Sequence, residues 1–104
     1  MDTFKVTTPL WRWQSPTGPA AWLFLTIAGD AADGIRLAAM SGQWLNGRRG
    51  FGSTKVCARI GETRWNTSVF PHRESGGWLL PVKASVRKAE GIVEGDEVTV
   101  TVSL

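Results

Sequence analysis

The stretch KVCARIGETRWNTSVF, from Lys55 to Phe70, carries the clearest structural signal in the chain. Two runs with alternating apolar residues flank Gly61-Glu62, and a glycine at the first central position suits a two-residue type II′ turn. The pattern predicts a β-hairpin in which Arg59 lies opposite Arg64. Strand alternation then assigns each side chain to one of two faces. The face toward the core is predicted to carry Val56, Ala58, Ile60, Trp65 and Thr67, and the other face Lys55, Cys57, Arg59, Arg64, Asn66 and Ser68.

Further strand signals lie on both sides of this hairpin. Residues 98–104 alternate between aliphatic and hydroxyl side chains, as a half-buried strand does. Residues 4–13 form a strand candidate broken by Pro9, which indicates an edge, a bend or a bulge because proline cannot donate to a ladder. Short apolar runs at residues 21–27 and 78–82 complete a count of about six strands.

Two short helices are expected between the strands. Residues 31–40 place apolar side chains at helical spacing after Asp30, and Gly42 is predicted to end this helix. Residues 43–53 are rich in glycine and predict a loop. Residues 84–90 predict a second helix that Gly91 ends. The fold class is therefore mainly β, a small barrel of about six strands with helices at residues 30–40 and 84–90.

Length and composition predict one domain over residues 1–104. Hydrophobic residues make up 42% and charged residues 20% of the chain, which is ordinary globular usage. The N-terminus lacks a secretory pattern, and no apolar run is long enough to span a membrane. Cys57 is the single cysteine and cannot form an internal disulfide. These features favour a cytoplasmic protein without a membrane segment.

Several segments resemble the Domain of Unknown Function 1905 (DUF1905) family. They are residues 51–53 (FGS), 60–71 (IGETRWNTSVFP), 79–91 (LLPVKASVRKAEG) and 95–98 (GDEV), with a weaker likeness at residues 22–24 (WLF). The resemblance implies a double-split β-barrel, related in architecture to AbrB/MazE-type domains. A faint echo between residues 20–24 and 76–80 agrees with such a pseudo-symmetric barrel. The family has no established reaction, so the resemblance implies no catalytic residue.

No catalytic or cofactor motif is recognisable. Gly47 and Gly52 have the spacing of a phosphate-binding loop, but Ser53 occupies the position where that motif needs lysine, and a strand follows. Ser68 and His72 could form a nucleophile and base, but no third group is visible to orient the histidine, and a solvated side chain is favoured. One cysteine, one histidine and scattered acids do not match metal-ligand spacing. We therefore expect neither a cofactor nor a metal, and catalysis stays an open question.

Six tryptophans in 104 residues are a high density for a chain without tyrosine. Indole rings fill small barrels well, and the apolar strand context of Trp22, Trp65 and Trp78 favours the core for all three. Trp11, Trp13 and Trp44 lie near turns and arginines. For these three, core packing and stacking on a ligand are equally supported.

The basic residues permit an anionic partner without requiring one. The net charge is +3, and the predicted hairpin places Arg59 against Arg64, an unfavourable pair unless a counter-charge is near. Lys83 and Arg87 lie four residues apart on the second predicted helix, another pair of like charges. The predicted ligand-binding residues are Arg64, Lys83, Arg87, Arg59 and Trp44. A solvated face, or salt bridges to Glu62, Glu74 or Glu90, is the alternative interpretation.

Three functions from different classes follow from these observations. The leading one is a module that binds a small anionic or aromatic ligand in a basic cleft. The second is an AbrB-like nucleic-acid-binding domain, with phosphates contacted by Arg48, Arg49, Arg59 and Arg64. The third is a protein-interaction module, which requires an exposed apolar patch. The chain is expected to be a monomer or a weak homodimer.

Overall fold

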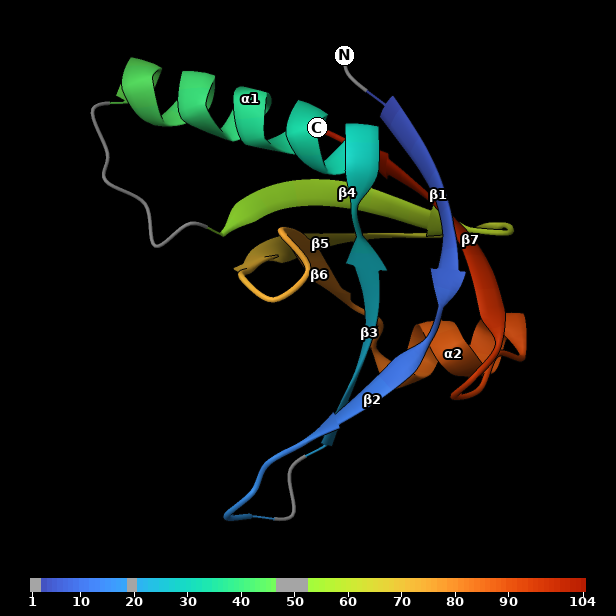
Figure 1. Ribbon diagram of the computed structural model, residues 1–104. Helices are drawn as coiled ribbons and strands as arrows, with labels where there is room; N and C mark the ends of the chain where they lie inside the picture. Colours follow the sequence, from blue (N-terminus) through green and yellow to red (C-terminus); the bar gives the residue numbers. More distant parts are fainter. Residues whose placement is uncertain (1–2, 19–20, 47–52) are drawn as a thin grey trace.

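A computed structural model describes residues 3–18, 21–46 and 53–104, with only the backbone for residues 40–46 (Figure 1). Over these residues the chain forms seven strands and two helices, so the predicted mainly β class is confirmed and the strand count rises from six to seven. The elements are β1 (Thr3–Pro9), β2 (Trp11–Gln14), β3 (Ala21–Ile27), α1 (Gly29–Asn46), β4 (Thr54–Ile60), β5 (Thr63–His72), β6 (Gly77–Pro81), α2 (Ala84–Glu90) and β7 (Glu97–Ser103).

The strands form one antiparallel sheet in the order β1-β7-β4-β5-β6-β3-β2. β1 and β2 occupy the two ends of this order, although only Leu10 separates them in the chain. The sheet must therefore curl until its two edges meet at Leu10, and the result is a half-barrel (Figure 1). The predicted break at Pro9 is confirmed, and it supplies the seventh strand.

The hairpin of β4 and β5 has the predicted register. Ile60 pairs with Thr63, and Arg59 pairs with Arg64. Gly61, the first central residue of the turn, has a positive φ of 59°, and Glu62, the second, does not have a positive φ. This combination fits a type II′ turn. Val56, Ala58, Ile60 and Trp65 are buried as expected, whereas Thr67 is only half-buried.

The core lies on the inner side of the curled sheet, where alternate residues of the strands are buried. Trp65 and Trp78 belong to it, as predicted. Trp22 does not, because its side chain is 54% exposed, and the expectation of a core role is wrong. In β3 the buried positions are Leu25 and Ile27, so strand alternation turns Trp22 to the opposite face.

Helix α2 matches its predicted bounds, whereas α1 is longer than predicted. Gly91 adopts the left-handed conformation with a φ of 64° at the end of α2. α1 continues to Asn46, so the predicted end at Gly42 and the predicted loop over residues 43–46 are wrong. One glycine costs a helix only about 1 kcal/mol, which its neighbours offset. The rest of the predicted loop, residues 47–52, lies outside the described residues. Neither helix has the length and apolarity to cross a bilayer in its described part.

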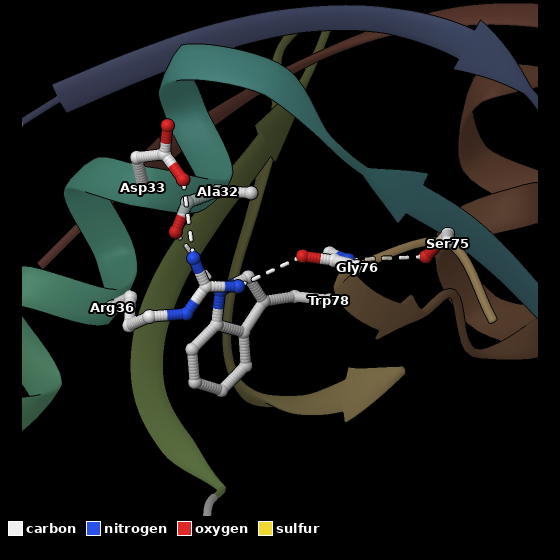
Figure 2. A network of polar contacts seen from close by, with 7 residues as sticks. Ala32, Asp33, Arg36, Ser75, Gly76 and Trp78 are labelled. Carbon is white, nitrogen blue, oxygen red and sulfur yellow. Dashed lines mark hydrogen bonds and ion pairs between the residues drawn. The ribbon is translucent and has the colours of Figure 1, made fainter. Parts of the chain in front are cut away.

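Polar contacts attach α1 to the turn between β5 and β6 (Figure 2). The Trp78 indole Nε1 donates a hydrogen bond to the Ala32 carbonyl at 3.1 Å, inside the core. Arg36 donates through Nη2 to the Gly76 carbonyl at 2.8 Å and forms a salt bridge with Asp33 at 3.1 Å. Together these contacts orient α1 against the inner side of the sheet.

Helix α2 is attached to the inner side of β5. The Thr63 hydroxyl donates a hydrogen bond to Glu90 Oε2, and Val86 is buried in the core. Figure 1 shows α1 and α2 near opposite ends of the curled sheet. The described contacts of both helices are thus with the inner side, and the other side of the sheet is left free of helices.

Candidate functional site

The strand registers join positions from all seven strands into one continuous surface, here called the outward face. It is the side of the sheet opposite the buried core, and residues directly opposite one another on paired strands project from the same side. On β5 it begins at Arg64 and ends at His72. The half formed by β1, β7, β4 and β5 is polar, and the half formed by β5, β6, β3 and β2 is aromatic.

The aromatic half contains a pocket of about 530 Å³. Trp22 and Phe24 stack with their ring centroids 6.4 Å apart and their planes inclined by 13°. Trp13, opposite Trp22, is 43% exposed, and Phe70 is 45% exposed. The pocket is lined by Trp13, Trp22, Phe24, Thr67, Ser68, Phe70, Leu79 and Pro81. It is therefore an apolar site open to solvent, with aromatic rings from three strands.

A second ring system braces this pocket. Trp11 packs against Phe24 at 5.5 Å between centroids and donates a hydrogen bond from Nε1 to the Thr26 hydroxyl at 2.8 Å. The His72 ring lies 6.2 Å from Trp11, and its Nδ1 is hydrogen-bonded to Ser75 Oγ at 2.8 Å. These contacts hold Trp11 and His72 behind Phe24 and so support the wall of the pocket.

Beside the aromatic pocket lies a polar hollow of about 610 Å³. Thr67 and Ser68 line both, so the two spaces adjoin at β5. Lys55, paired with Ser68 across the hairpin, is one of the residues that line the polar hollow. Its lining residues are Lys55, Val56, Cys57, Asn66, Thr67, Ser68, Ser103 and Leu104. An anionic group attached to a ring in the pocket could reach Lys55 through this opening.

A row of cations crosses the polar half of the outward face. Lys5 pairs with Thr101, Thr101 with Arg59, and Arg59 with Arg64, so the row runs over β1, β7, β4 and β5. Arg59 donates from Nε to the Gly61 carbonyl at 2.8 Å, which holds the side chain and leaves both terminal guanidinium nitrogens for a ligand. A hollow of about 400 Å³ lies at this row, lined by Lys5, Arg59, Gly61, Thr99 and Thr101.

These cations have no acidic partner among the described residues. The salt bridges found there are Arg36 with Asp33 and, at 4.0 Å, His72 with Glu74. Over the described outward positions of β1, β7, β4 and β5 the only carboxylate is Glu97, at the start of β7. The outward face is thus basic although the whole chain carries a net charge of only +3.

The structure separates the predicted ligand-binding residues into two groups. Arg59 and Arg64 lie together on the outward face. Lys83 is the N-cap residue of α2 and Arg87 lies within the helix, where its Nε donates to the Val82 carbonyl at 3.2 Å. Helix α2 contacts β5 through Thr63, on the side opposite Arg64, and the convergence of Arg64, Lys83 and Arg87 on one anion stays a prediction. Trp44 lies in α1, and its side chain is outside the described part of the chain.

The described residues do not bring together the dyad or a metal-ligand cluster considered from the sequence. Ser68 and His72 are four residues apart on one strand, about 13 Å in an extended chain, too far for a hydrogen bond. No cluster of three or more His, Cys, Asp or Glu side chains is found in the described segments.

Sequence reasoning missed most of the aromatic pocket. The apolar strand context of Trp22 predicts a core position, and no sequence signal gives Phe24, Phe70 or Leu79 a role in a site. The signal present in the sequence is the alternation of Trp11 with Trp13 and of Trp22 with Phe24, which places each pair on one face. That these faces meet Phe70 follows only from the long-range pairing of β3 with β6 and of β6 with β5.

Comparisons with known proteins identify the family of this chain. A search of curated proteins finds no match to the sequence. Residues 7–102 match the family described as Domain of unknown function (DUF1905), a span that covers β2 to β6 in full, the end of β1 and nearly all of β7. The resemblance noted from the sequence is therefore confirmed over nearly the whole chain, and the protein belongs to the DUF1905 family.

Proposed function

We propose that the protein is a binding module for a small anionic compound that contains an aromatic ring. The aromatic pocket holds the ring, and this pocket is the observation that carries the proposal. Its volume of about 530 Å³ falls in the range of roughly 300–1,000 Å³ that ligand sites occupy. Its walls are aromatic and apolar, with Thr67 and Ser68 as the polar groups at one side.

The anionic part of the ligand is proposed from the neighbouring polar hollow. Ser68 borders both spaces, and Lys55 stands opposite Ser68 on the paired strand. A carboxylate or phosphate reaching across Ser68 meets the Lys55 ammonium and the Asn66 amide. A neutral ring lacks this attraction, so charge is expected to distinguish ligands that fill the pocket equally well.

Three finer expectations belong to the same proposal. The half-barrel is proposed to be the double-split arrangement that the family resemblance implies, with the strands at Trp22 and Trp78 in corresponding places. The protein is proposed to act in the cytoplasm as a monomer or weak homodimer. The basic cleft of Arg64, Lys83 and Arg87 remains a proposed second anion site.

The proposal is tested by titrating 1-naphthoate and its neutral analogue 1-naphthylmethanol into the protein by calorimetry. Wild type is expected to bind the carboxylate more tightly than the alcohol. Trp22→Ala, which removes a stacked wall, is expected to weaken both by roughly threefold to tenfold. Lys55→Gln is expected to weaken only the carboxylate, by roughly twofold to fivefold.

Lys88→Gln is the matched control, because Lys88 is an exposed cation on α2. It removes the same charge without touching the outward face, and it should leave both affinities unchanged. Trp22→Phe should retain most of the binding because it keeps an aromatic wall. Equal affinity of wild type and Trp22→Ala for both compounds contradicts the proposed site.

A further inference from the structure

We propose that the outward face binds single-stranded nucleic acid, with one base in the aromatic pocket and the following phosphates over the cation row. This inference rests on the proposed function, because it names the chemical class of the ligand and extends the site across four strands. Proteins that bind single strands without strong sequence preference combine stacking aromatic side chains with a basic track for the backbone. Both features are present here on one sheet face.

The first argument is the distribution of charge. Lys5, Lys55, Arg59 and Arg64 all project from the outward face, where Glu97 is the only carboxylate at the described positions of the same four strands. The remaining described acids lie on helices, turns and loops. A basic stripe on one face of a chain with modest net charge is the electrostatic footprint of a polyanion site.

The second argument is the cost of leaving this face without a counter-charge. Arg59 and Arg64 stand directly opposite one another, an arrangement that is unfavourable for like charges. The hydrogen bond from Arg59 Nε to the Gly61 carbonyl holds the Arg59 guanidinium close to the turn, near Arg64. A phosphate at this position accepts hydrogen bonds from both guanidinium groups and relieves the repulsion.

The third argument is the spacing of the two halves. Adjacent strands lie about 4.8 Å apart, so the row from Lys5 to Arg64 extends about 14 Å. Ser68, at the mouth of the aromatic pocket, is four residues from Arg64 on β5, about 13 Å along the strand. The surface between them carries the hydrogen-bonding side chains of Asn66 and Ser103. A single-stranded segment of about four nucleotides fits the path from the aromatic pocket to the cation row. Four nucleotides are about the lower limit for compact single-strand sites.

The shape of the face favours a single strand over a duplex. The described contacts of α1 and α2 are with the inner side, so the outward face presents no helix to a major groove. The Trp13, Trp22 and Phe70 rings need an unpaired base, because paired bases in a duplex are stacked on their neighbours. A duplex can satisfy the cation row but not the aromatic pocket.

The test measures fluorescence anisotropy of a labelled twelve-nucleotide oligothymidylate at several salt concentrations. A duplex of the same length and thymidine monophosphate, added as a competitor, complete the panel. We expect the single strand to bind more tightly than either, with log K falling against log salt at a slope of about −2 to −3 for three to four phosphates. Arg59→Gln and Arg64→Gln should each reduce this slope by about 0.7. Trp22→Ala should weaken the oligonucleotide and the mononucleotide alike.

The single cysteine provides a second readout in the same protein. Cys57 is half-buried and lines the polar hollow between the pocket and the row. A bound oligonucleotide is expected to slow its alkylation by iodoacetamide severalfold in wild type, and much less in Arg59→Gln. Lys88→Gln is again the control, and it should retain both the salt slope and the protection of Cys57.

The outcomes separate this inference from the proposed function. If the oligonucleotide binds no more tightly than the mononucleotide while 1-naphthoate still binds, the pocket is a small-molecule site and the nucleic-acid inference is overturned. If neither binds, both proposals fail. Equal affinity for the duplex, an equal loss in Lys88→Gln, or self-association that occludes Cys57 without nucleic acid also overturns the inference.

Discussion

Trp22 and Trp65 show how strand parity decides the role of a side chain. Trp65 is 8% exposed on the inner side of β5, and its cross-strand partner Ala58 pairs in turn with Val102 on β7. Trp22 is 54% exposed on the outward face, stacked on Phe24. The same residue type therefore stabilises the core at one position and forms a wall of the candidate site at the other.

Trp65→Ala is expected to lower the free energy of unfolding by about 3–5 kcal/mol, because it leaves a large cavity beside Ala58 and Val102. Trp22→Ala is the matched control, and it should cost less than about 1 kcal/mol because its ring already contacts solvent. Urea unfolding followed by circular dichroism measures both. A loss below about 1 kcal/mol for Trp65→Ala contradicts the assignment of Trp65 to the core.

At the level of elements, the turn between β5 and β6 contains two adjacent glycines with different constraints. Gly76 has a φ of 72° and open space around it. A side chain on Gly77 instead collides with the backbone carbonyl of Ile27, on the neighbouring strand β3. A glycine is favoured at position 76 because of the positive φ of the backbone. At position 77 a glycine is favoured because β6 approaches β3 too closely for a side chain.

Gly77→Ala is expected to destabilise the protein by about 2 kcal/mol or more, because neither backbone can move without breaking the β3–β6 pairing. Gly76→Asn should cost less than about 1 kcal/mol, since asparagine tolerates the left-handed region. Thermal unfolding of the two variants provides the comparison. Equal losses at both positions are incompatible with this account of the turn.

Local pattern predicted the elements whose partners are near in sequence, and failed where partners are distant. The register of β4 and β5 followed from alternation and Gly61 because the two strands are joined by two residues. The length of α1 did not, because a glycine such as Gly42 weakens a helix without ending it. In the cation row, the pairing of Arg59 with Arg64 was predicted because both residues belong to one hairpin. The position of Lys5 beside them was not, because β7 lies between β1 and β4 in the sheet.

At the scale of the whole molecule, Leu10 is the corner that closes the half-barrel. It is 1% exposed, its amide donates to the Asp96 carbonyl at 2.9 Å, and its carbonyl accepts from the Gly95 amide at 2.8 Å. These bonds attach the junction of β1 and β2 to the loop before β7. The curl of the sheet, and with it the position of the aromatic half relative to the cation row, depends on this corner.

Leu10→Ala is expected to lower the free energy of unfolding by about 2–5 kcal/mol, as for other fully buried leucines. Leu37→Ala on α1, where the side chain is 67% exposed, is the control and should change it by less than about 0.5 kcal/mol. Guanidinium unfolding monitored by tryptophan fluorescence checks both. A small loss for Leu10→Ala would show that the sheet does not depend on this corner.

The pairing of β1 with β7 also has a consequence for folding. Thr3 lies opposite Ser103, and among the described strands β1 pairs only with β7. During synthesis, β1 must therefore wait without a partner until the last of the seven strands has left the ribosome. Contacts of such long sequence separation slow folding, because chain entropy is lost before they form. We infer that the domain completes its fold late, after release of β7, whereas the β2–β3 pair, made of neighbouring strands synthesised before β4, is the first part able to form.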